Sequence, residues 1–240
     1  MPRKTRKSAA HPPPPEGDAV GDGAPRQPRR RRAPDRAAAL LQYRERADIY
    51  DLELAAFEWL RRRAIGRLDL EPGDVVLDAG CGTGLSLALL RAGVGAKGRI
   101  IGIEQSPEMI AQARQRVAGK GWTNVKLLCA PIEAVRIPCR LDAALFHFTH
   151  DILRRPEALA NVIGRLKPGA KVVACGLKWA GPWAVPSNLF VWAAALHSVT
   201  SFEGLYQPWD GLAARLGPMD VESLALGSVY LATARHAARA

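Results

Sequence analysis

The feature that most constrains this 240-residue chain is a short apolar run that passes directly into a glycine-rich turn. Residues 75–84 read VVLDAGCGTG. A strand followed by closely spaced glycines indicates a sharp backbone turn that a ligand can approach closely. In open α/β sheets, such turns lie at the carboxyl ends of the strands, where ligands bind. The segment therefore predicts an α/β fold with a ligand site at the end of its first strand.

Apolar runs and helical patterns alternate after this segment. Strands are expected at 99–103, 125–129, 141–146 and 171–176, and helices at 37–50, 52–65, 85–91, 108–117, 155–166, 188–197 and 209–216. Ser106 is a candidate N-cap and Pro107 suits the first helical position, whereas residues 167–169 (KPG) predict a helix end. Strands at 221–226 and 229–233, separated by Gly227-Ser228, predict a hairpin. The fold class predicted is α/β: a doubly wound, Rossmann-like, seven-stranded sheet, mostly parallel with an antiparallel C-terminal hairpin.

The positive charge is concentrated at the N-terminus. The whole chain has a formal net charge of +11, and residues 1–36 hold ten Lys/Arg against four Asp/Glu, a balance of +6. This proline- and arginine-rich stretch has almost no large apolar residue, which predicts a disordered basic tail. Residues 37–240 then form one domain, with cap helices at 37–70 and an aromatic-rich insertion at 178–218. The tail can serve to contact nucleic acid, but a solubilising extension is the favoured interpretation.

Several classes of protein are not expected. No apolar run reaches the roughly 18 residues that span a bilayer, and the N-terminus lacks the apolar core of a secretory signal. The four cysteines form no CxxC pair, so no metal site is predicted. The expectation is a cytoplasmic protein without a membrane span.

The carboxylate of Asp78 decides between two kinds of nucleotide ligand. A dinucleotide-binding turn follows the pattern GxGxxG, whereas here the third glycine, Gly84, comes one position early. A carboxylate directly before the turn would repel a pyrophosphate but would suit a cationic ligand. S-adenosylmethionine has a sulfonium and an amino group and no phosphate. The segment therefore favours S-adenosylmethionine over NAD.

Residues 75–84 resemble motif I of the class I S-adenosylmethionine-dependent methyltransferases, especially the small-molecule branch near the ubiquinone and menaquinone enzymes. The resemblance implies that the glycine turn passes under the amino-acid end of the cofactor, with Asp78 near its amino group. Glu104 would accept hydrogen bonds from both ribose hydroxyls, and Met109 would pack on adenine. The cofactor contacts that it implies are Tyr50, Asp78, Ala79, Gly80, Cys81, Gly82, Glu104, Gln105, Met109, Pro131, Ile132 and Phe146.

The chain departs from the family pattern after the third strand. The family usually has Gly-Asp-Ala there, with the Asp near the adenine amino group, whereas residues 130–132 are Ala-Pro-Ile. The backbone N–H of Ile132 can still reach a ring nitrogen. Glu133 is either a substitute for the missing Asp or a solvated acid at a helix start. The resemblance further implies that an N-terminal helix covers the cofactor, with Tyr43 or Tyr50 near its carboxylate.

Catalytic candidates follow the fourth strand, where residues 146–151 read FHFTHD. Methyl transfer mainly requires alignment of the acceptor with the methyl group and exclusion of water. Where the acceptor must lose a proton, His147 and His150 are the candidate bases because the ordinary histidine pKa lies near neutrality, and Asp151 can orient either one. The alternatives are that His150 and Asp151 cap the next helix and that His147 packs under the cofactor.

The resemblance implies a methyltransferase (EC 2.1.1.-) that acts on a small-molecule acceptor. The insertion at 178–218 contains four of the six tryptophans, which suits either an apolar acceptor pocket or a small satellite core. Two other functions stay open: an RNA or protein methyltransferase that uses the basic tail, and a non-catalytic protein that binds S-adenosylmethionine.

Overall fold

The computed structural model describes residues 56–198 and 202–237. All of them belong to the second of two compact units, residues 33–240. The tail predicted at 1–36, the helix predicted at 37–50 and the candidates Tyr43 and Tyr50 lie outside the described residues.

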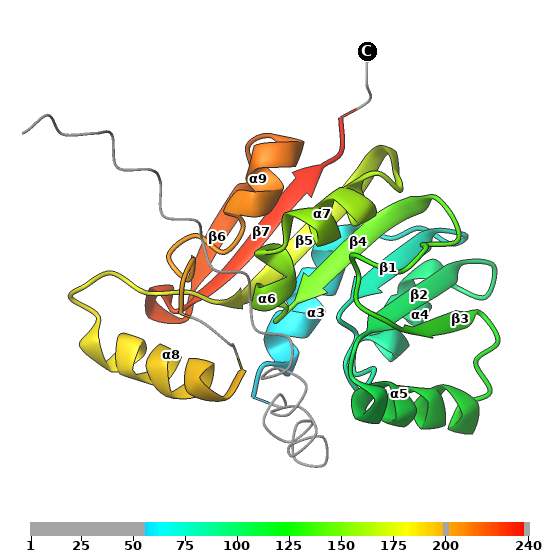
Figure 1. Cartoon of the computed structure of the whole chain (residues 1–240), viewed down its shortest axis with the longest axis horizontal. Helices are drawn as coiled ribbons and strands as arrows, with labels where there is room; N and C mark the ends of the chain where they lie inside the picture. Colours follow the sequence, from blue (N-terminus) through cyan, green and yellow to red (C-terminus); the bar gives the residue numbers. More distant parts are fainter. Residues whose placement is uncertain (1–55, 199–201, 238–240) are drawn as a thin grey trace, which may run out of the picture. The chain divides into compact units, whose positions relative to one another are not determined.

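The described elements alternate between helices and strands over most of their length (Figure 1). Their bounds are α3 (Glu58–Leu68), β1 (Val75–Ala79), α4 (Leu87–Val94), β2 (Arg99–Glu104), α5 (Pro107–Gly119), β3 (Val125–Cys129), β4 (Leu141–His147), α6 (His150–Leu153), α7 (Pro156–Ile163), β5 (Leu166–Leu177), α8 (Val185–Ser198), α9 (Asp210–Leu216), β6 (Asp220–Leu224), a 3-10 turn (Ala225–Gly227) and β7 (Val229–Arg235).

The strands form one seven-stranded sheet in the order β3-β2-β1-β4-β5-β7-β6. Neighbours from β3 to β5 pair in parallel, whereas β7 pairs antiparallel with both β5 and β6. The predicted fold class is therefore confirmed. Strand order reverses between β1 and β4, and the carboxyl ends of strands at such a reversal form the usual crevice for a ligand.

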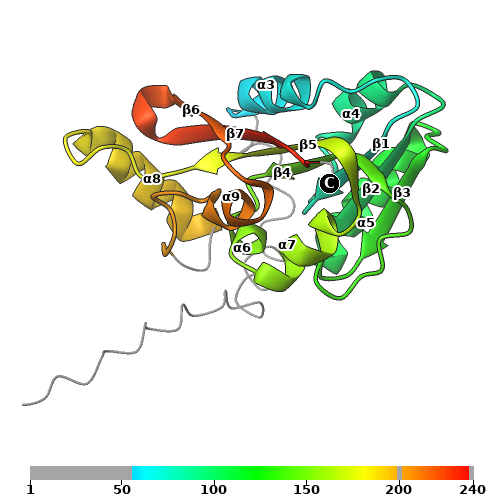
Figure 2. The same cartoon turned by 90° about the horizontal axis from the view of Figure 1, so that it is seen from above.

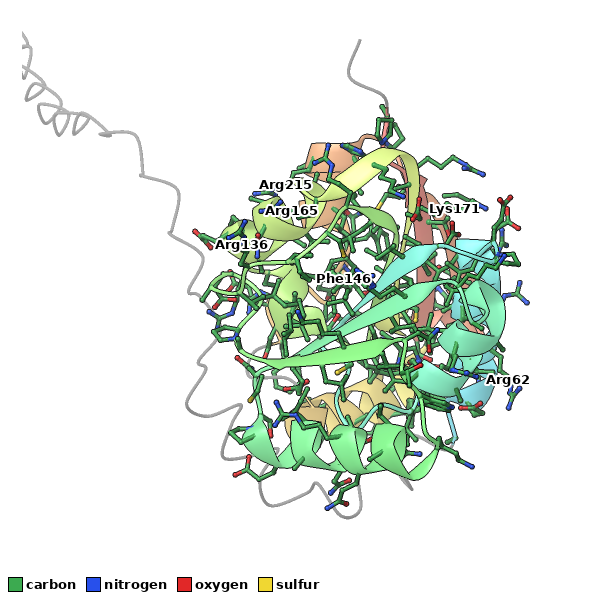
Figure 3. The ribbon with its side chains drawn as sticks, turned by 90° about the vertical axis from the view of Figure 1, so that its right-hand side faces the viewer. Arg62, Arg136, Phe146, Arg165, Lys171 and Arg215 are labelled. Carbon is green, nitrogen blue, oxygen red and sulfur yellow. The ribbon has the colours of Figure 1, made fainter. Side chains whose placement is uncertain are left out.

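Helices cover both faces of the sheet, each over its own apolar layer (Figure 2). One layer joins α3 and α4 to Leu145 of β4, and the other joins α6, α7 and α9 to Phe146 of the same strand. Successive side chains of a strand point to opposite faces, so His147 continues the α3 face. Figure 3 accordingly shows Phe146 inside the sheet region, while the labelled arginines and Lys171 lie at the periphery.

The cap of α5 forms as its sequence predicts. The Ser106 hydroxyl accepts a hydrogen bond from the Met109 N–H at 3.2 Å, and Pro107 occupies the first turn. Ser106 is fully buried, so this cap also satisfies a polar group that would otherwise be costly to bury. The helix start is thereby held next to the end of β2.

The helix predicted at 155–166 ends at Ile163, the helix predicted at 85–91 lies at Leu87–Val94, and the one predicted at 52–65 lies at Glu58–Leu68. Two connections also differ from the prediction. The strand predicted at 171–176 begins at Leu166, so residues 167–169 lie inside β5. In the pairing of β4 with β5, Leu141 lies opposite Leu166 but Ala143 lies opposite Lys171. The register therefore shifts at this point, and residues 167–169 lie in the irregular part of β5. The hairpin connection is also longer than Gly227-Ser228, because β6 ends at Leu224 and the chain turns through the 3-10 segment.

Candidate functional site

The glycine turn at the end of β1 is held against the tip of β2. The N–H groups of Gly80 and Cys81 donate to the Ile103 carbonyl at 2.8 and 3.0 Å. Gly80 has a φ of 78°, and a Cβ there would lie 2.6 Å from Thr149 Cγ2. Only glycine combines this left-handed backbone with so close a neighbour, so glycine at this position lets the turn pack against the segment that follows β4.

Glu104 connects the glycine turn to the start of α5. Its Oε2 accepts from the Gly82 N–H at 3.2 Å, and its Oε1 accepts from the Ser106 N–H at 2.8 Å. Burial raises the pKa of Glu104, and these backbone donors oppose the rise. The backbone N–H groups that act on this carboxylate belong to Ser106, Gly82 and Gln105. The two oxygens of a carboxylate offer about four acceptor positions, so Glu104 can still accept from a ligand.

The larger hollow lies over the ends of β1, β2 and β3 and has about 670 Å³ of space open to solvent. Its lining comes from these strand ends and from the segment after β4: Gly80, Gly82, Ile103, Glu104, Gln105, Met109, Ala130, Pro131, Ile132, Glu133, Phe148, Thr149, Asp151, Ile152 and Arg155. Seven of the twelve predicted cofactor contacts are among them. Glu133 lies in this lining, where its half-buried side chain forms an ion pair with Arg155 at 3.3 Å.

A smaller hollow of about 300 Å³ shares Gly80 and Gly82 with the first. It is lined by Arg61, Asp78, Gly80, Cys81, Gly82, Thr83, Leu85, Ser86 and His147. Asp78 of β1 and His147 of β4 reach this hollow from the sheet, and Arg61 reaches it from α3, which covers the same face. The two hollows therefore form neighbouring parts of one site on either side of the glycine turn.

Buried polar atoms in the smaller hollow lack hydrogen-bond partners among the described residues. They are Nε and Nη2 of Arg61, Oδ2 of Asp78 and Nε2 of His147. Arg61 is only 2% exposed, and its Nη1 donates to Glu58. Buried polar groups are nearly always paired, so this group of a cation, a carboxylate and an imidazole has the composition of a binding site for a polar ligand.

Burial changes the protonation of Asp78. Desolvation raises the pKa of Asp78 to about 7, while Arg61 lowers it and Glu104 raises it. A cationic ligand beside Asp78 would favour the carboxylate form, because an opposite charge lowers the pKa of an acid.

The two candidate histidines have different surroundings, and neither keeps the ordinary pKa on which their selection rested. Burial and the nearby Arg61 lower the pKa of His147 to about 3. Burial lowers that of His150 to about 4, and its Nε2 lies 3.0 Å from the Glu203 carbonyl oxygen. His147 lines the smaller hollow, whereas His150 lines neither hollow and begins α6. Neither histidine therefore has the near-neutral pKa that was expected of a general base.

Two further predicted cofactor contacts lie away from the open space. Ala79 and Phe146 are fully buried in the apolar layer beneath α6 and α7 and line neither hollow. In contrast, Arg61 lines the smaller hollow and was not predicted. It lies in an arginine-rich part of α3 (EWLRRRAIGRL), where only the helical phase distinguishes the buried arginine from its exposed neighbours.

The aromatic insertion forms part of a core and part of a surface. Trp179 stacks on Phe202 with 5.9 Å between ring centroids, whereas Trp183 is 79% exposed. The insertion lines neither of the two hollows. Phe148, which lines the larger hollow, packs on Phe57 with 4.8 Å between the ring centroids. The Phe57 centroid in turn lies 6.3 Å from that of Phe190 in α8. Aromatic rings thus connect the larger hollow to the insertion.

Residues 56–198 and 202–237 contain neither a membrane-spanning helix nor a cluster of metal-ligating side chains. No helix in these ranges has both the length and the apolarity to span a bilayer. The same ranges contain no group of three or more His, Cys, Asp or Glu side chains that could hold a metal ion. All four cysteines are free.

Comparison with known proteins identifies the kind of domain. Residues 76–169 match the family model described as a methyltransferase domain. The chain is 42% identical over 117 residues to a protein-L-isoaspartate O-methyltransferase of Methanococcus aeolicus, covering 45% of this chain and 48% of the relative. It is 35% identical over 119 residues to a demethylmenaquinone methyltransferase of Shouchella clausii, covering 47% and 49%. The chain thus spans about half the length of these relatives.

The fold is also found in solved structures. One is the N-methyltransferase NodS from Bradyrhizobium japonicum in complex with S-adenosylhomocysteine, with a TM-score of 0.53 and 18% sequence identity. The similarity covers 75% of this chain and 87% of that chain. At this identity, the comparison establishes a shared fold.

Replacement of Asp78 by Asn should change how stability depends on pH. The native carboxyl binds a proton between its usual pKa of 3.8 and its raised pKa of about 7, whereas the unfolded one does not. Because the native state holds this proton more tightly than the unfolded state does, protonation of Asp78 stabilises the native state. This stabilisation is complete below about pH 4 and is lost as the pH rises toward 7. The free energy of unfolding of the native sequence should therefore fall, relative to Asp78→Asn, by up to about 4 kcal/mol across that window.

The measurement is urea unfolding of both proteins at several pH values. Parallel stability curves across this range would show that Asp78 is not protonated in the native state.

Proposed function

Residues 76–169 belong to the class I S-adenosylmethionine-dependent methyltransferase family, and on this premise we propose that the chain binds S-adenosylmethionine and methylates a small apolar acceptor. One observation carries the proposal: two adjoining hollows share the glycine turn, one beside the Glu104 carboxylate and the other with buried charges of both signs. These two environments suit the two ends of the cofactor, a nucleoside and a zwitterionic amino acid.

The larger hollow suits the nucleoside. Glu104 would accept from the ribose hydroxyls, and its hydrogen bonds from backbone N–H groups hold it in place. Met109 offers an apolar surface for adenine, and Pro131 and Ile132 lie at the edge of the same space. The Pro131 side chain cannot hydrogen-bond adenine, so recognition there would depend on backbone groups.

The smaller hollow suits the amino-acid end. The Arg61 guanidinium has two unpaired nitrogens for a carboxylate, and the Asp78 carboxylate has an unpaired oxygen for an ammonium group. Charge-assisted hydrogen bonds are about twice as strong as neutral ones, and burial excludes competing water. Nε2 of His147, neutral because of its lowered pKa, can accept a further hydrogen bond.

The protein's own contribution to methyl transfer would be alignment and exclusion of water. When bound, S-adenosylmethionine supplies a methyl group on a sulfonium that is already activated by its positive charge. Phe148 and Thr149 lie over the larger hollow and would position an acceptor there. With pKa values of about 3 and 4, His147 and His150 are weak bases, so we assign neither of them proton removal.

Aromatic rings around the site support an apolar acceptor. Phe148 lines the larger hollow and packs edge-on against Phe57. Aromatic side chains provide large apolar walls for a ligand. The similarity to the demethylmenaquinone methyltransferase supports a small aromatic substrate, whereas the similarity to the protein-L-isoaspartate O-methyltransferase supports the alternative of a protein substrate.

Replacement of Glu104 by Gln should weaken cofactor binding by about 1–3 kcal/mol, because a glutamine cannot accept the same set of charge-assisted hydrogen bonds. The measurement is calorimetric titration with S-adenosylhomocysteine. Glu157→Gln, an exposed acid at the start of α7, is the matched control and should bind as the native chain does. Unchanged affinity in Glu104→Gln would exclude the ribose contact.

Replacement of Arg61 by Met should weaken S-adenosylhomocysteine but not 5′-methylthioadenosine, which lacks the amino-acid end. The expected loss is at least tenfold, because a buried charged partner is removed. Binding of methylthioadenosine reports that the fold is intact, and Arg62→Met, on the exposed side of the same helix, is the control. Equal losses for both ligands would contradict a specific contact to the carboxylate.

Turnover tests the acceptor. The full chain with methyl-labelled S-adenosylmethionine should label apolar aromatic small molecules and leave protein and RNA unlabelled. Phe57→Ala should raise KM for such an acceptor while the affinity for S-adenosylhomocysteine stays unchanged, since Phe57 supports Phe148 and lines neither hollow. Label in protein or RNA would favour a macromolecular substrate, and binding without any labelled product would favour a non-catalytic protein.

A further inference from the structure

Large apolar side chains are exposed together around α8. Among the described residues, six of the eight exposed large hydrophobic side chains lie between residues 183 and 206. We name them the α8 patch: Trp183, Val185, Leu189, Phe190, Trp192 and Tyr206. Their exposed fractions range from 48% to 79%. Exposed hydrophobic side chains scattered singly need no explanation, whereas several gathered in one part of a fold indicate an interaction site.

Helix α8 has the wrong composition for a helix that faces only water. Its sequence, VPSNLFVWAAALHS, contains no Asp, Glu, Lys or Arg. Solvated helices normally have a charged or polar face, and a helix without one is covered by protein or lipid. Among residues 56–198 and 202–237, the sheet covers Val191 fully but leaves Leu189 62% exposed.

The patch lies at the same edge of the sheet as the candidate site. Helix α8 follows the carboxyl end of β5, and both views show it beyond the tip of that strand (Figures 1 and 2). Phe57 contacts Phe190 of the patch and Phe148 of the larger hollow. A partner on the patch would therefore lie beside the entrance to the site.

The residue types favour a bilayer surface as that partner. Trp183, Trp192 and Tyr206 each join an apolar ring to a polar N–H or O–H group. Such side chains are enriched where a membrane meets water, because the ring enters the apolar region while the polar group stays hydrated.

Charge distinguishes a bilayer from a second copy of the chain. The stretch from Trp179 to Glu203 contains no Lys or Arg, so the patch itself is apolar, whereas the whole chain has a net charge of +11, of which residues 1–36 hold +6. Two copies would repel each other, whereas an anionic lipid surface attracts basic protein segments. Weak apolar anchoring and electrostatic attraction together give stable binding where either alone is marginal.

From these observations we infer that the α8 patch docks on the surface of an anionic lipid bilayer. This inference goes beyond the proposed methylation and does not depend on it. Docking would insert the tryptophan rings among the lipid headgroups and turn the Phe148 side of the site toward the membrane. An apolar acceptor could then enter from the lipid.

The test is co-sedimentation of the full chain with vesicles of phosphatidylcholine, with and without an equal part of phosphatidylglycerol. The native chain should bind the anionic vesicles and bind the neutral ones much less. The double variant Trp183→Ser, Trp192→Ser should partition at least tenfold more weakly, because it loses the two largest apolar rings of the patch. The matched double variant Trp183→Phe, Trp192→Phe keeps large apolar rings and should bind within a few fold of the native chain.

Each other outcome contradicts the inference in a defined way. Absence of vesicle binding overturns it, and equal binding by the serine variant assigns membrane contact to another part of the chain. Equal binding to neutral vesicles removes the role of charge. Light scattering without lipid is the second measurement, and a dimer that the serine variant dissociates would assign the patch to a second copy. Calorimetry with S-adenosylhomocysteine on both variants reports their fold and tests the proposed cofactor separately.

Discussion

The paired hydrogen bonds of the Glu104 carboxylate are the interaction on which the site depends. One oxygen accepts from Gly82 of the glycine turn and the other from Ser106 at the start of α5. The loop after β1 and the loop after β2 are thereby fixed relative to each other at the carboxyl edge of the sheet. The Glu104 carbonyl also accepts from the Ala130 N–H at 3.0 Å, which adds the loop after β3. A carboxylate on a short, buried strand end thus sets the shape of the larger hollow.

Burial of charge gives the smaller hollow its chemistry. Asp78 and His147 end neighbouring parallel strands and point to the face covered by α3, from which Arg61 reaches them. Their unpaired atoms are costly in the free protein, and a zwitterionic ligand would offset that cost by supplying both missing charges. The site would then select its ligand by charge in the smaller hollow and by shape in the larger one. The apolar α8 patch adds a third environment at the same sheet edge.

The regular elements of the sheet were predictable because their determinants are local. The register of β1 against β2 begins at Val75 and Arg99, close to where the apolar runs begin. Prediction failed where pairing overrode local preference. Lys167-Pro168-Gly169 is a helix-ending sequence, yet it lies within β5 because the strand starts early beside Leu141. The C-terminal hairpin was predicted correctly, but its connection is longer than expected because Ala225 and Leu226 adopt positive φ angles, which these residue types rarely do.

The sequence by itself determined the order of strands and helices, the glycine turn, the α5 cap and the carboxylates at the ends of β1 and β2. Short-range patterns specify all of these. Only the tertiary structure decided that Arg61 faces Asp78, that His147 lines a hollow while His150 bonds to the Glu203 carbonyl, and that Phe146 is in the core. These facts depend on which faces of separate elements meet. That is set by packing over long sequence separations, which no local pattern encodes.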